Sequence, residues 1–221
     1  MIAEFGHFLL ILALFSAITQ AVVPLYGAHV KDYPMALTGR QAAICQFILV
    51  AGSFCCLTYL YINSDFSVLN VVQNSHTDKP LIYKISGVWG NHEGSLLLWV
   101  LILALFGAAL AVFGKNLPPF FHAKVLSIQA LIGIGFYLLI ILTSNPFERV
   151  LHPPLNGNDL NPLLQDPGLA FHPPMLYLGY VGFSIAFSFA IAALIDGEVN
   201  SSWARWVRPW TLAAWSFLTG G

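Results

Sequence analysis

The run SLLLWVLILALFGAALAVF, from Ser95 to Phe113, decides the class of fold because it contains no charged residue. The hydrocarbon core of a membrane is about 30 Å thick and needs about 20 predominantly apolar residues to be crossed by a helix. A helix also satisfies its own backbone N–H and C=O groups, which find no water in lipid. This run therefore predicts a membrane-spanning helix.

The rest of the chain repeats this pattern. Of the 221 residues, 57% are hydrophobic and 9% are charged, whereas a soluble domain carries about 25% charged residues. The N-terminal run resembles a signal peptide, but Glu4 stands where a basic residue belongs, so we expect a retained helix. Further apolar runs extend over Phe8–Tyr26, Gln41–Ile62, Val125–Thr143 and Pro173–Ile195. We predict an all-α polytopic membrane bundle with five complete transmembrane helices.

A sixth helix is predicted to begin near Pro209. Its uncharged stretch reaches Gly221 and is too short to cross a bilayer. A helix end left in lipid would carry unsatisfied carbonyl groups. We therefore expect the native chain to continue, or a partner subunit to complete the bundle.

The loop charges predict the orientation. Six of the nine basic residues fall in the three short connections: Lys31, Arg40, Lys115, Lys124, Arg205 and Arg208. Basic residues in short loops favour the cytoplasmic side. We expect a multi-pass membrane protein whose N-terminus and two long loops face outward, to a periplasm or its equivalent. The basic residues are scattered singly, which argues against nucleic acid as a partner.

The two loops on the outer side, residues 63–94 and 144–172, are long. Loops beyond about 12 to 15 residues are usually functional or disordered. The first loop holds aromatic and β-branched residues, and the second is punctuated by Pro, Asn and Gly in patterns that specify turns. We expect ordered loops and a functional site on the outer face.

His172 is the main candidate site residue. Proline at 173 disfavours an α conformation at His172, and proline is well tolerated in a first helical turn. We therefore expect His172 at or just before the start of the fifth helix. The positive end of that helix keeps the imidazole neutral, the state that an iron ligand requires. The alternative is an interfacial histidine bonded only to water or a loop carbonyl.

Two further outer-face residues have competing interpretations. His92 precedes a helix that Gly94 or Ser95 can cap, and it either belongs to that helix start or contacts a ligand. Arg149 either pairs with Glu148 or Asp159, or receives a carboxylate or propionate of a ligand. Another histidine, His152, lies in mid-loop, and the three cysteines fall within one apolar run, so none of these is given a role.

Four strings in order carry a family resemblance: WGNHEGSLLLWV, SNPFER, DLNPLLQDPGLAFHPPMLYLGYVGFS and WARWVRPWTLAAWSFLT. They resemble the N-terminal part of the CcmF family, the membrane haem lyase subunit of cytochrome c maturation. Asn91 departs from the family pattern, which has alanine there, and His152 has no counterpart. The resemblance extends over nearly all of residues 1–221, which we interpret as one transmembrane part of such a subunit.

The resemblance implies a function. In the family, haem arrives at the outer face on the haem chaperone CcmE. Its vinyl groups are then joined to the thiols of a CxxCH motif in apocytochrome c, held by CcmH-type and thioredoxin-like subunits. The resemblance implies that His172 is one of two axial ligands of the haem iron, with Arg149 near a propionate.

Two characteristic features of the family are missing from these residues. The family's tryptophan-rich segment and second outer-face histidine are absent from these residues. We therefore expect a half-site, inactive as a haem lyase without the remainder of the CcmF-type subunit. Three alternatives stay open: the sister subunit that serves nitrite reductase, a transporter, and a structural assembly subunit.

Overall fold

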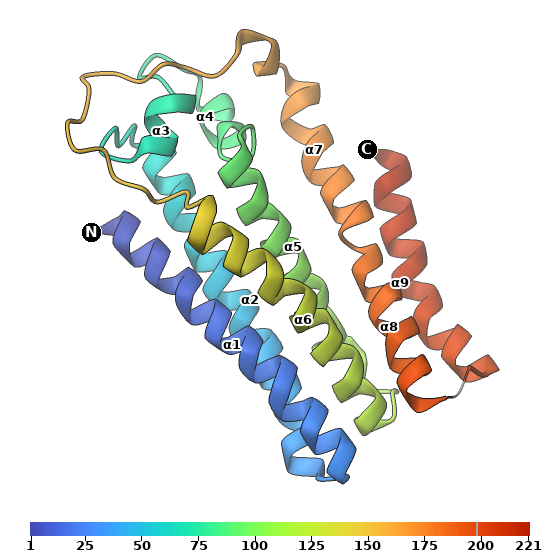
Figure 1. The fold of residues 1–221 in the computed structure, drawn as a ribbon. Helices are drawn as coiled ribbons and strands as arrows, with labels where there is room; N and C mark the ends of the chain where they lie inside the picture. Colours follow the sequence, from blue (N-terminus) through green and yellow to red (C-terminus); the bar gives the residue numbers. More distant parts are fainter. Residues whose placement is uncertain (198) are drawn as a thin grey trace.

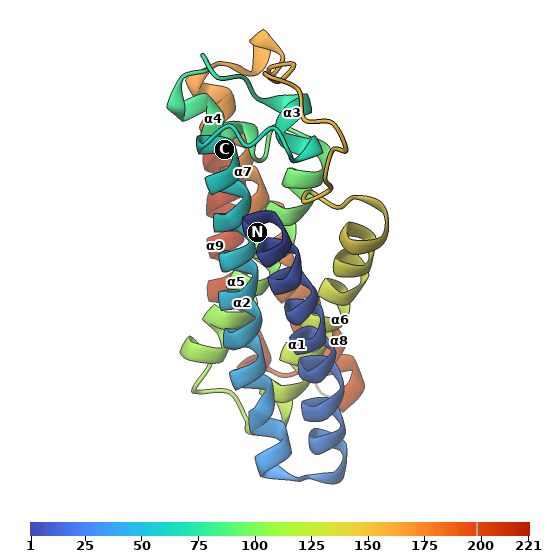
Figure 2. The ribbon, with the colours of Figure 1, turned by 90° about the vertical axis from the view of Figure 1, so that its left-hand side faces the viewer.

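The computed structural model describes residues 1–197 and 199–221, with the side chains of 164 and 169 left out. The chain is a bundle of long helices with short helices at one end (Figures 1 and 2). The elements are α1 (Ile2–Val30), α2 (Tyr33–Ile62), α3 (Leu69–Asn74), α4 (Leu81–Gly87), α5 (His92–Phe113), α6 (Pro119–Thr143), the 3₁₀ helix η1 (Pro162–Leu164), α7 (Pro167–Tyr180), α8 (Phe183–Asp196) and α9 (Ser201–Gly220).

The prediction of an all-α membrane bundle is confirmed. Within the described residues, five helical segments are long and apolar enough to cross a membrane: α1, α2, α5, α6 and the run Ala170–Asp196. Several begin earlier than their apolar runs. For example, α2 begins at Tyr33, where the Asp32 carboxylate accepts a hydrogen bond from the Met35 N–H at 2.9 Å. Hydropathy identifies the part of a helix inside lipid, whereas caps decide where the helix begins.

Buried glutamines join the helices of the bundle. The Gln129 amide on α6 donates to the Leu103 carbonyl of α5 at 3.2 Å and to the Ser184 hydroxyl of α8 at 2.8 Å. The Gln46 amide on α2 donates to the Tyr137 hydroxyl of α6 at 2.9 Å. Interhelical hydrogen bonds of this kind stabilise helix association in lipid. They fix α6 in the centre of the bundle.

The predicted fifth helix is interrupted. Its hydrogen-bonding pattern tightens after α7, where the Ser184 N–H donates to the Val181 carbonyl at 3.0 Å and the Ile185 N–H to the Gly182 carbonyl at 3.2 Å. A Cβ at Gly182 would lie 2.6 Å from Phe106 Cζ of α5. The chain therefore needs glycine where the interruption packs against α5. The hydropathy pattern is continuous and gives no sign of this break.

The predicted start of the sixth helix at Pro209 is wrong. This helix, α9, begins at Ser201, where the Asn200 side chain accepts from the Trp203 N–H at 3.0 Å. Pro209 lies inside the helix. The first turns are polar, so hydropathy alone misses them. Helix α9 packs beside α7 and α8 on one flank of the bundle (Figure 1).

The two long outer loops form a single ordered layer, here called the outer cap (residues 63–91 and 144–166). The predicted bounds 63–94 and 144–172 are too wide, because α5 begins at His92 and α7 at Pro167. The Leu69 N–H donates to the Glu148 carbonyl at 2.8 Å, and the Asn158 N–H donates to the Val72 carbonyl at 2.7 Å. Each loop thus supplies backbone partners for the other.

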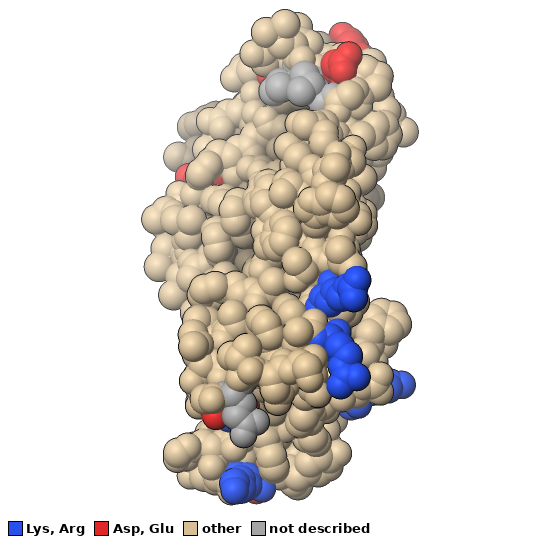
Figure 3. Space-filling model, turned by 90° about the vertical axis from the view of Figure 1, so that its right-hand side faces the viewer, with Lys and Arg blue, Asp and Glu red and all other residues tan. Residues whose placement is uncertain are grey.

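Charge is distributed unequally between the two ends of the molecule. The blue Lys and Arg atoms visible in Figure 3 gather in the half that contains the short connections, and the largest red group lies at the opposite end. This distribution is the one that the loop sequences predict.

Candidate functional site

His172 lies inside a helix rather than before one. Helix α7 begins at Pro167, and Asp166 supplies its start, since the Asp166 carboxylate accepts from the Gly168 N–H at 2.8 Å and its carbonyl from the Ala170 N–H at 3.0 Å. The expectation that Pro173 marks the helix start is therefore wrong. The restriction that proline places on the preceding residue is a preference, and the helix overrides it here.

A neighbouring side chain replaces the hydrogen bond that is lost at one of the two internal prolines of α7, Pro174. Pro174 has no N–H, so the Ala170 carbonyl, four residues earlier, loses its donor. The Trp89 indole N–H donates to that carbonyl at 3.2 Å. Trp89 belongs to the WGNHEG string, where its aromatic character alone suggests only an interfacial anchor. A proline inside a helix is the signal for such a partner, because the carbonyl four residues earlier then needs a hydrogen-bond donor from elsewhere.

Aromatic side chains hold α7 against the bundle. The rings of Trp99 on α5 and Phe136 on α6 stack with centroids 4.9 Å apart. Tyr177 and Tyr180 of α7 approach Trp99 edge-on, with centroids at 5.9 and 5.1 Å. Such pairs contribute about 0.5–1.5 kcal/mol beyond burial. The cluster fixes the position of α7 about one and a half to two turns below His172.

The His172 ring is exposed and faces the end of α9. Its Nδ1 lies within hydrogen-bonding distance of the Gly221 carbonyl. A neutral imidazole that donates from Nδ1 to a backbone carbonyl keeps the Nε2 lone pair available. Metal-bound histidines commonly use this arrangement, because the bond fixes both the tautomer and the ring orientation. The geometry therefore fits an iron ligand that binds through Nε2.

Close packing between α7 and α9 determines which residue faces His172. A Cβ at Gly179 would lie 2.6 Å from Leu218 Cα, so only glycine lets the two backbones approach there. A Cβ at Gly221 would lie 3.0 Å from Met175 Cβ. Met175 and Gly179 follow His172 at i+3 and i+7, on the same face of the helix.

Large apolar side chains are exposed around the outer end. Phe171, next to His172, is 66% exposed, and Leu163 is 79% exposed. In the second loop of the outer cap, Leu155 and Leu151 are also almost fully exposed. Large exposed apolar side chains can belong to a binding surface when they lie together. A flat apolar ligand such as a haem ring would find apolar partners beside His172.

Arg149 is already engaged in ion pairs. Its guanidinium pairs with Glu4, with Nη2 and Oε1 at 2.7 Å, and approaches the Asp65 carboxylate at 3.8 Å. The expected partners Glu148 and Asp159 are therefore wrong. Figures 1 and 2 place the start of α1, where Glu4 lies, and α7 on different sides of the outer end. Arg149 and His172 are thus tied to different parts of the molecule.

His92 is the first residue of α5 and is exposed. Its Nε2 lies 3.3 Å from the Ser144 hydroxyl, just after α6. The cap of α5 is neither Gly94 nor Ser95, because the Asn91 side chain accepts from the Gly94 N–H at 2.9 Å. Asn91 Nδ2 also donates to the Tyr61 hydroxyl at 3.0 Å and to the Gly87 carbonyl at 2.8 Å. Asn91 therefore joins α2, α4 and α5, a role that sequence reasoning misses.

A buried lysine lies within the outer cap. Lys79 is 5% exposed, and its Nζ donates to the Asn74 carbonyl at 2.8 Å. The Asp159 carboxylate lies 3.8 Å from the same Nζ. Burial lowers the pKa of Lys79 from 10.5 to about 8, although the Asp159 charge opposes this shift. Lys79 lies in a polar stretch of sequence, which does not indicate that its side chain is buried.

The fold and these residues define a helical membrane protein with an exposed histidine at the end of the bundle that carries the two long loops. A family model described as "Cytochrome C assembly protein" matches residues 89–221, which include α5 to α9 and His172. The chain belongs to this family. The resemblance to CcmF proposed from the sequence motifs is confirmed.

Comparisons with individual relatives support membership of the same family. The chain is 62% identical over 221 residues to the cytochrome c-type biogenesis protein CycK of Bradyrhizobium diazoefficiens, covering 100% of the chain and 34% of the relative. It is 50% identical to the CcmF protein of Escherichia coli, covering 100% and 34%. A solved structure of the cytochrome c haem lyase CcmF superposes with a TM-score of 0.87 at 27% identity, covering 99% of this chain and 34% of that one. The chain thus spans about a third of the length of these relatives.

Proposed function

We propose that this chain forms the part of a haem lyase subunit that binds haem at the outer face and positions it for thioether attachment to apocytochrome c. The observation that carries the proposal is the His172 imidazole. It is exposed on α7, its Nδ1 is bonded to a backbone carbonyl, and it lies within the region that matches the cytochrome c assembly family. Relatives named as cytochrome c biogenesis proteins support the same interpretation.

In this proposal haem is a substrate rather than a resident cofactor. Nε2 of His172 supplies one axial ligand to the iron, and the second comes from the remainder of the CcmF-type subunit. The ring lies against exposed apolar side chains such as Phe171. Fixing the iron also fixes the vinyl groups, and such positioning can contribute several kcal/mol to a reaction between two molecules. The thiols belong to apocytochrome c.

The same proposal assigns partners and location. The outer face of the bacterial inner membrane, with the N-terminus outside, is where the haem chaperone CcmE and the CcmH-type and thioredoxin-like subunits would meet this chain. Arg149 would have to leave Glu4 to contact a propionate, and His92 is bonded to Ser144. Both are therefore weaker candidates than His172, on which the proposal rests.

The test compares two histidines that are each followed by two prolines. In the complete maturation system, we expect His172→Ala to abolish covalent haem on a reporter cytochrome c, measured by haem staining and absorbance. His152 is exposed in the outer cap, and His152→Ala should leave maturation unchanged. Normal maturation with His172→Ala, at equal membrane abundance, would refute the proposal.

A second candidate is the sister subunit that serves nitrite reductase. The chain is 40% identical to the NrfE protein of Haemophilus influenzae, covering 100% of the chain and 35% of the relative. The higher identity to the CycK and CcmF proteins favours the first candidate. Supplying the chain with the rest of either system and measuring which cytochrome acquires haem would separate the two.

A further inference from the structure

A hollow of about 380 Å³ lies at the opposite end of the molecule from His172. The connection between α5 and α6 forms one wall, and the first half of α9 forms the other. Its lining residues are Phe113, Gly114, Asn116, Leu117, Arg205, Trp206, Pro209, Trp210 and Ala213. The loop charges assign this end to the cytoplasmic leaflet.

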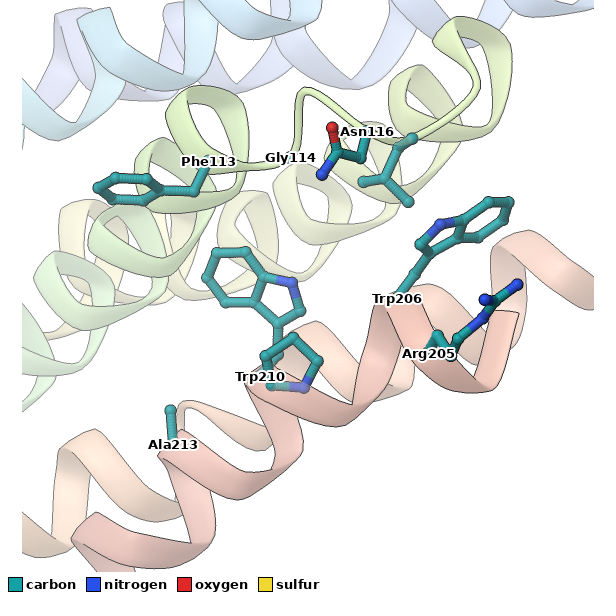
Figure 4. A pocket seen from close by; sticks show the side chains of 9 residues that line it. Phe113, Gly114, Asn116, Arg205, Trp206, Trp210 and Ala213 are labelled. Atoms are coloured by element: carbon teal, nitrogen blue, oxygen red, sulfur yellow. The ribbon is translucent and has the colours of Figure 1, made fainter. Parts of the chain in front are cut away.

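The polar side chains that line this hollow carry N–H donors, and the Asn116 amide has an acceptor oxygen as well. Figure 4 shows the indole nitrogens of Trp206 and Trp210 and the Asn116 amide directed toward the space between the loop and α9. Within the described part of the chain, no hydrogen bond engages these three side chains, and Arg205 contacts only the Ser202 hydroxyl, at 3.3 Å. An arrangement of N–H donors beside a guanidinium suits a phosphate oxygen.

The neighbouring hollows are basic as well, because Lys31 lines both of them. A hollow of about 740 Å³ between α1, α6 and α8 and one of about 280 Å³ beside α9 both contain Lys124. Lys124 is paired with Asp196. Among the described residues, no acidic side chain lines the hollow at Arg205, so none of them neutralises its positive charge from within.

The remaining walls are apolar and extend into the membrane. Phe113, Pro209 and Ala213 line the side away from Arg205, and Phe113 is 76% exposed. From Arg205 to Ala213 the helix rises about 12 Å, comparable with half of a hydrocarbon core of about 30 Å. A ligand that fits must have an anionic head at the membrane surface and an apolar tail beside it.

We propose that this hollow binds the phosphate of an anionic phospholipid of the cytoplasmic leaflet, with Arg205, Trp206, Trp210 and Asn116 at the headgroup and an acyl chain along Phe113 and Ala213. Basic pockets between transmembrane helices on the cytoplasmic side commonly bind anionic lipid headgroups. Tryptophan suits this position because its ring is apolar and its N–H is a donor. The site is independent of the proposed function at His172.

The test uses two matched pairs on α9. The chain is purified from membranes in mild detergent and supplied with phosphatidylglycerol, and retained lipid is counted by native mass spectrometry. Arg205→Gln should lower retention about fivefold, as expected from about 1 kcal/mol per surface arginine. Trp210→Phe, which keeps the ring but removes the N–H, should also lower it. The controls Arg208→Gln and Trp215→Phe alter exposed residues outside the hollow and should retain lipid normally.

Several outcomes would overturn the proposal. Equal losses in Arg205→Gln and Arg208→Gln would mean a diffuse charge effect. Equal retention of phosphatidylcholine would remove the need for an anionic head, and displacement by inorganic phosphate at millimolar concentration would indicate a free phosphate site. Asn116→Leu, in a loop, provides a variant that leaves α9 unchanged, and its loss of retention supports the site even where an α9 variant fails to fold.

Discussion

In the region formed by α1, α2, α5 and α6, buried amide side chains form hydrogen bonds to neighbouring helices. The region formed by α7, α8 and α9 is interrupted by proline and glycine, and its helices approach one another through backbone contacts. Gln129 and Gln46 are 3% and 4% exposed and each joins α6 to another helix. In the second region, a glycine lets α9 approach α7, and α7 carries His172. The contact between α7 and α9 is thus one of shape, while α9 is joined to α8 by a hydrogen bond from the Trp203 indole N–H to the Phe189 carbonyl at 3.1 Å.

The difference indicates how the candidate site is positioned. Hydrogen bonds tolerate a small shift of a side chain, but a backbone contact at a glycine tolerates no added atom. The partner of Nδ1 of His172, the Gly221 carbonyl, is held by this backbone contact between α7 and α9. The orientation of the candidate ligand therefore depends on the second region, and the first region serves as its support.

The largest expected effect tests the glycine contact. Gly179→Ala places a Cβ 2.6 Å from Leu218 Cα, so α7 and α9 must separate. We expect a loss of about 3 kcal/mol, the upper end of the usual cost of overpacking. Gly135→Ala is the control, because no atom lies within 4 Å of its Cβ and alanine is the better helix former. Unfolding in mixed micelles measures both, and equal stability of the two variants would contradict the comparison.

A smaller effect concerns the outer cap over the first region. The pKa of Lys79 is about 8 in the folded chain and about 10.4 when unfolded. The folded state therefore binds fewer protons between these values, and stability rises with pH across that window. We expect a gain of about 2 kcal/mol from about pH 7.5 to about pH 9.5.

Thermal unfolding at several pH values measures this gain. Lys79→Met removes the titrating group and should remove the rise, while Lys84→Met, which lies in α4 and keeps Lys79, should preserve it. A rise that persists in Lys79→Met would assign the pH dependence to another group.

The smallest effect tests the bond between the two regions. Gln129→Leu removes the hydrogen bonds from α6 to α5 and α8, and we expect a loss of about 1 kcal/mol. Gln20→Leu is the matched control. Gln20 donates to the Leu126 carbonyl at 2.9 Å, but its Oε1 is buried without a partner. Its replacement should change stability little, because leucine removes an unsatisfied polar atom together with one bond. A larger loss with Gln20→Leu would contradict the comparison.

The sequence alone determined the class of fold, the number of spans and the identity of His172 as the candidate ligand. Long uncharged runs have one outcome in lipid, because each backbone polar group must be satisfied within the helix. The motif strings containing Trp89 and His172 are sufficient by themselves to indicate the family. These properties are local, so a single stretch of sequence is enough to reveal them.

Only the tertiary structure decided where the site residues lie relative to one another. The break at Gly182 depends on Phe106 of α5, and the start of α7 depends on Asp166. Helix α7 tolerates Pro174 because Trp89, from another segment, supplies a hydrogen-bond donor. The sequence leaves Arg149 either paired with Glu148 or Asp159 or beside a ligand, but Glu4, distant in the chain, is its partner. Most of these features depend on contacts between segments far apart in the chain, and hydropathy, which reports on one segment at a time, has no access to them.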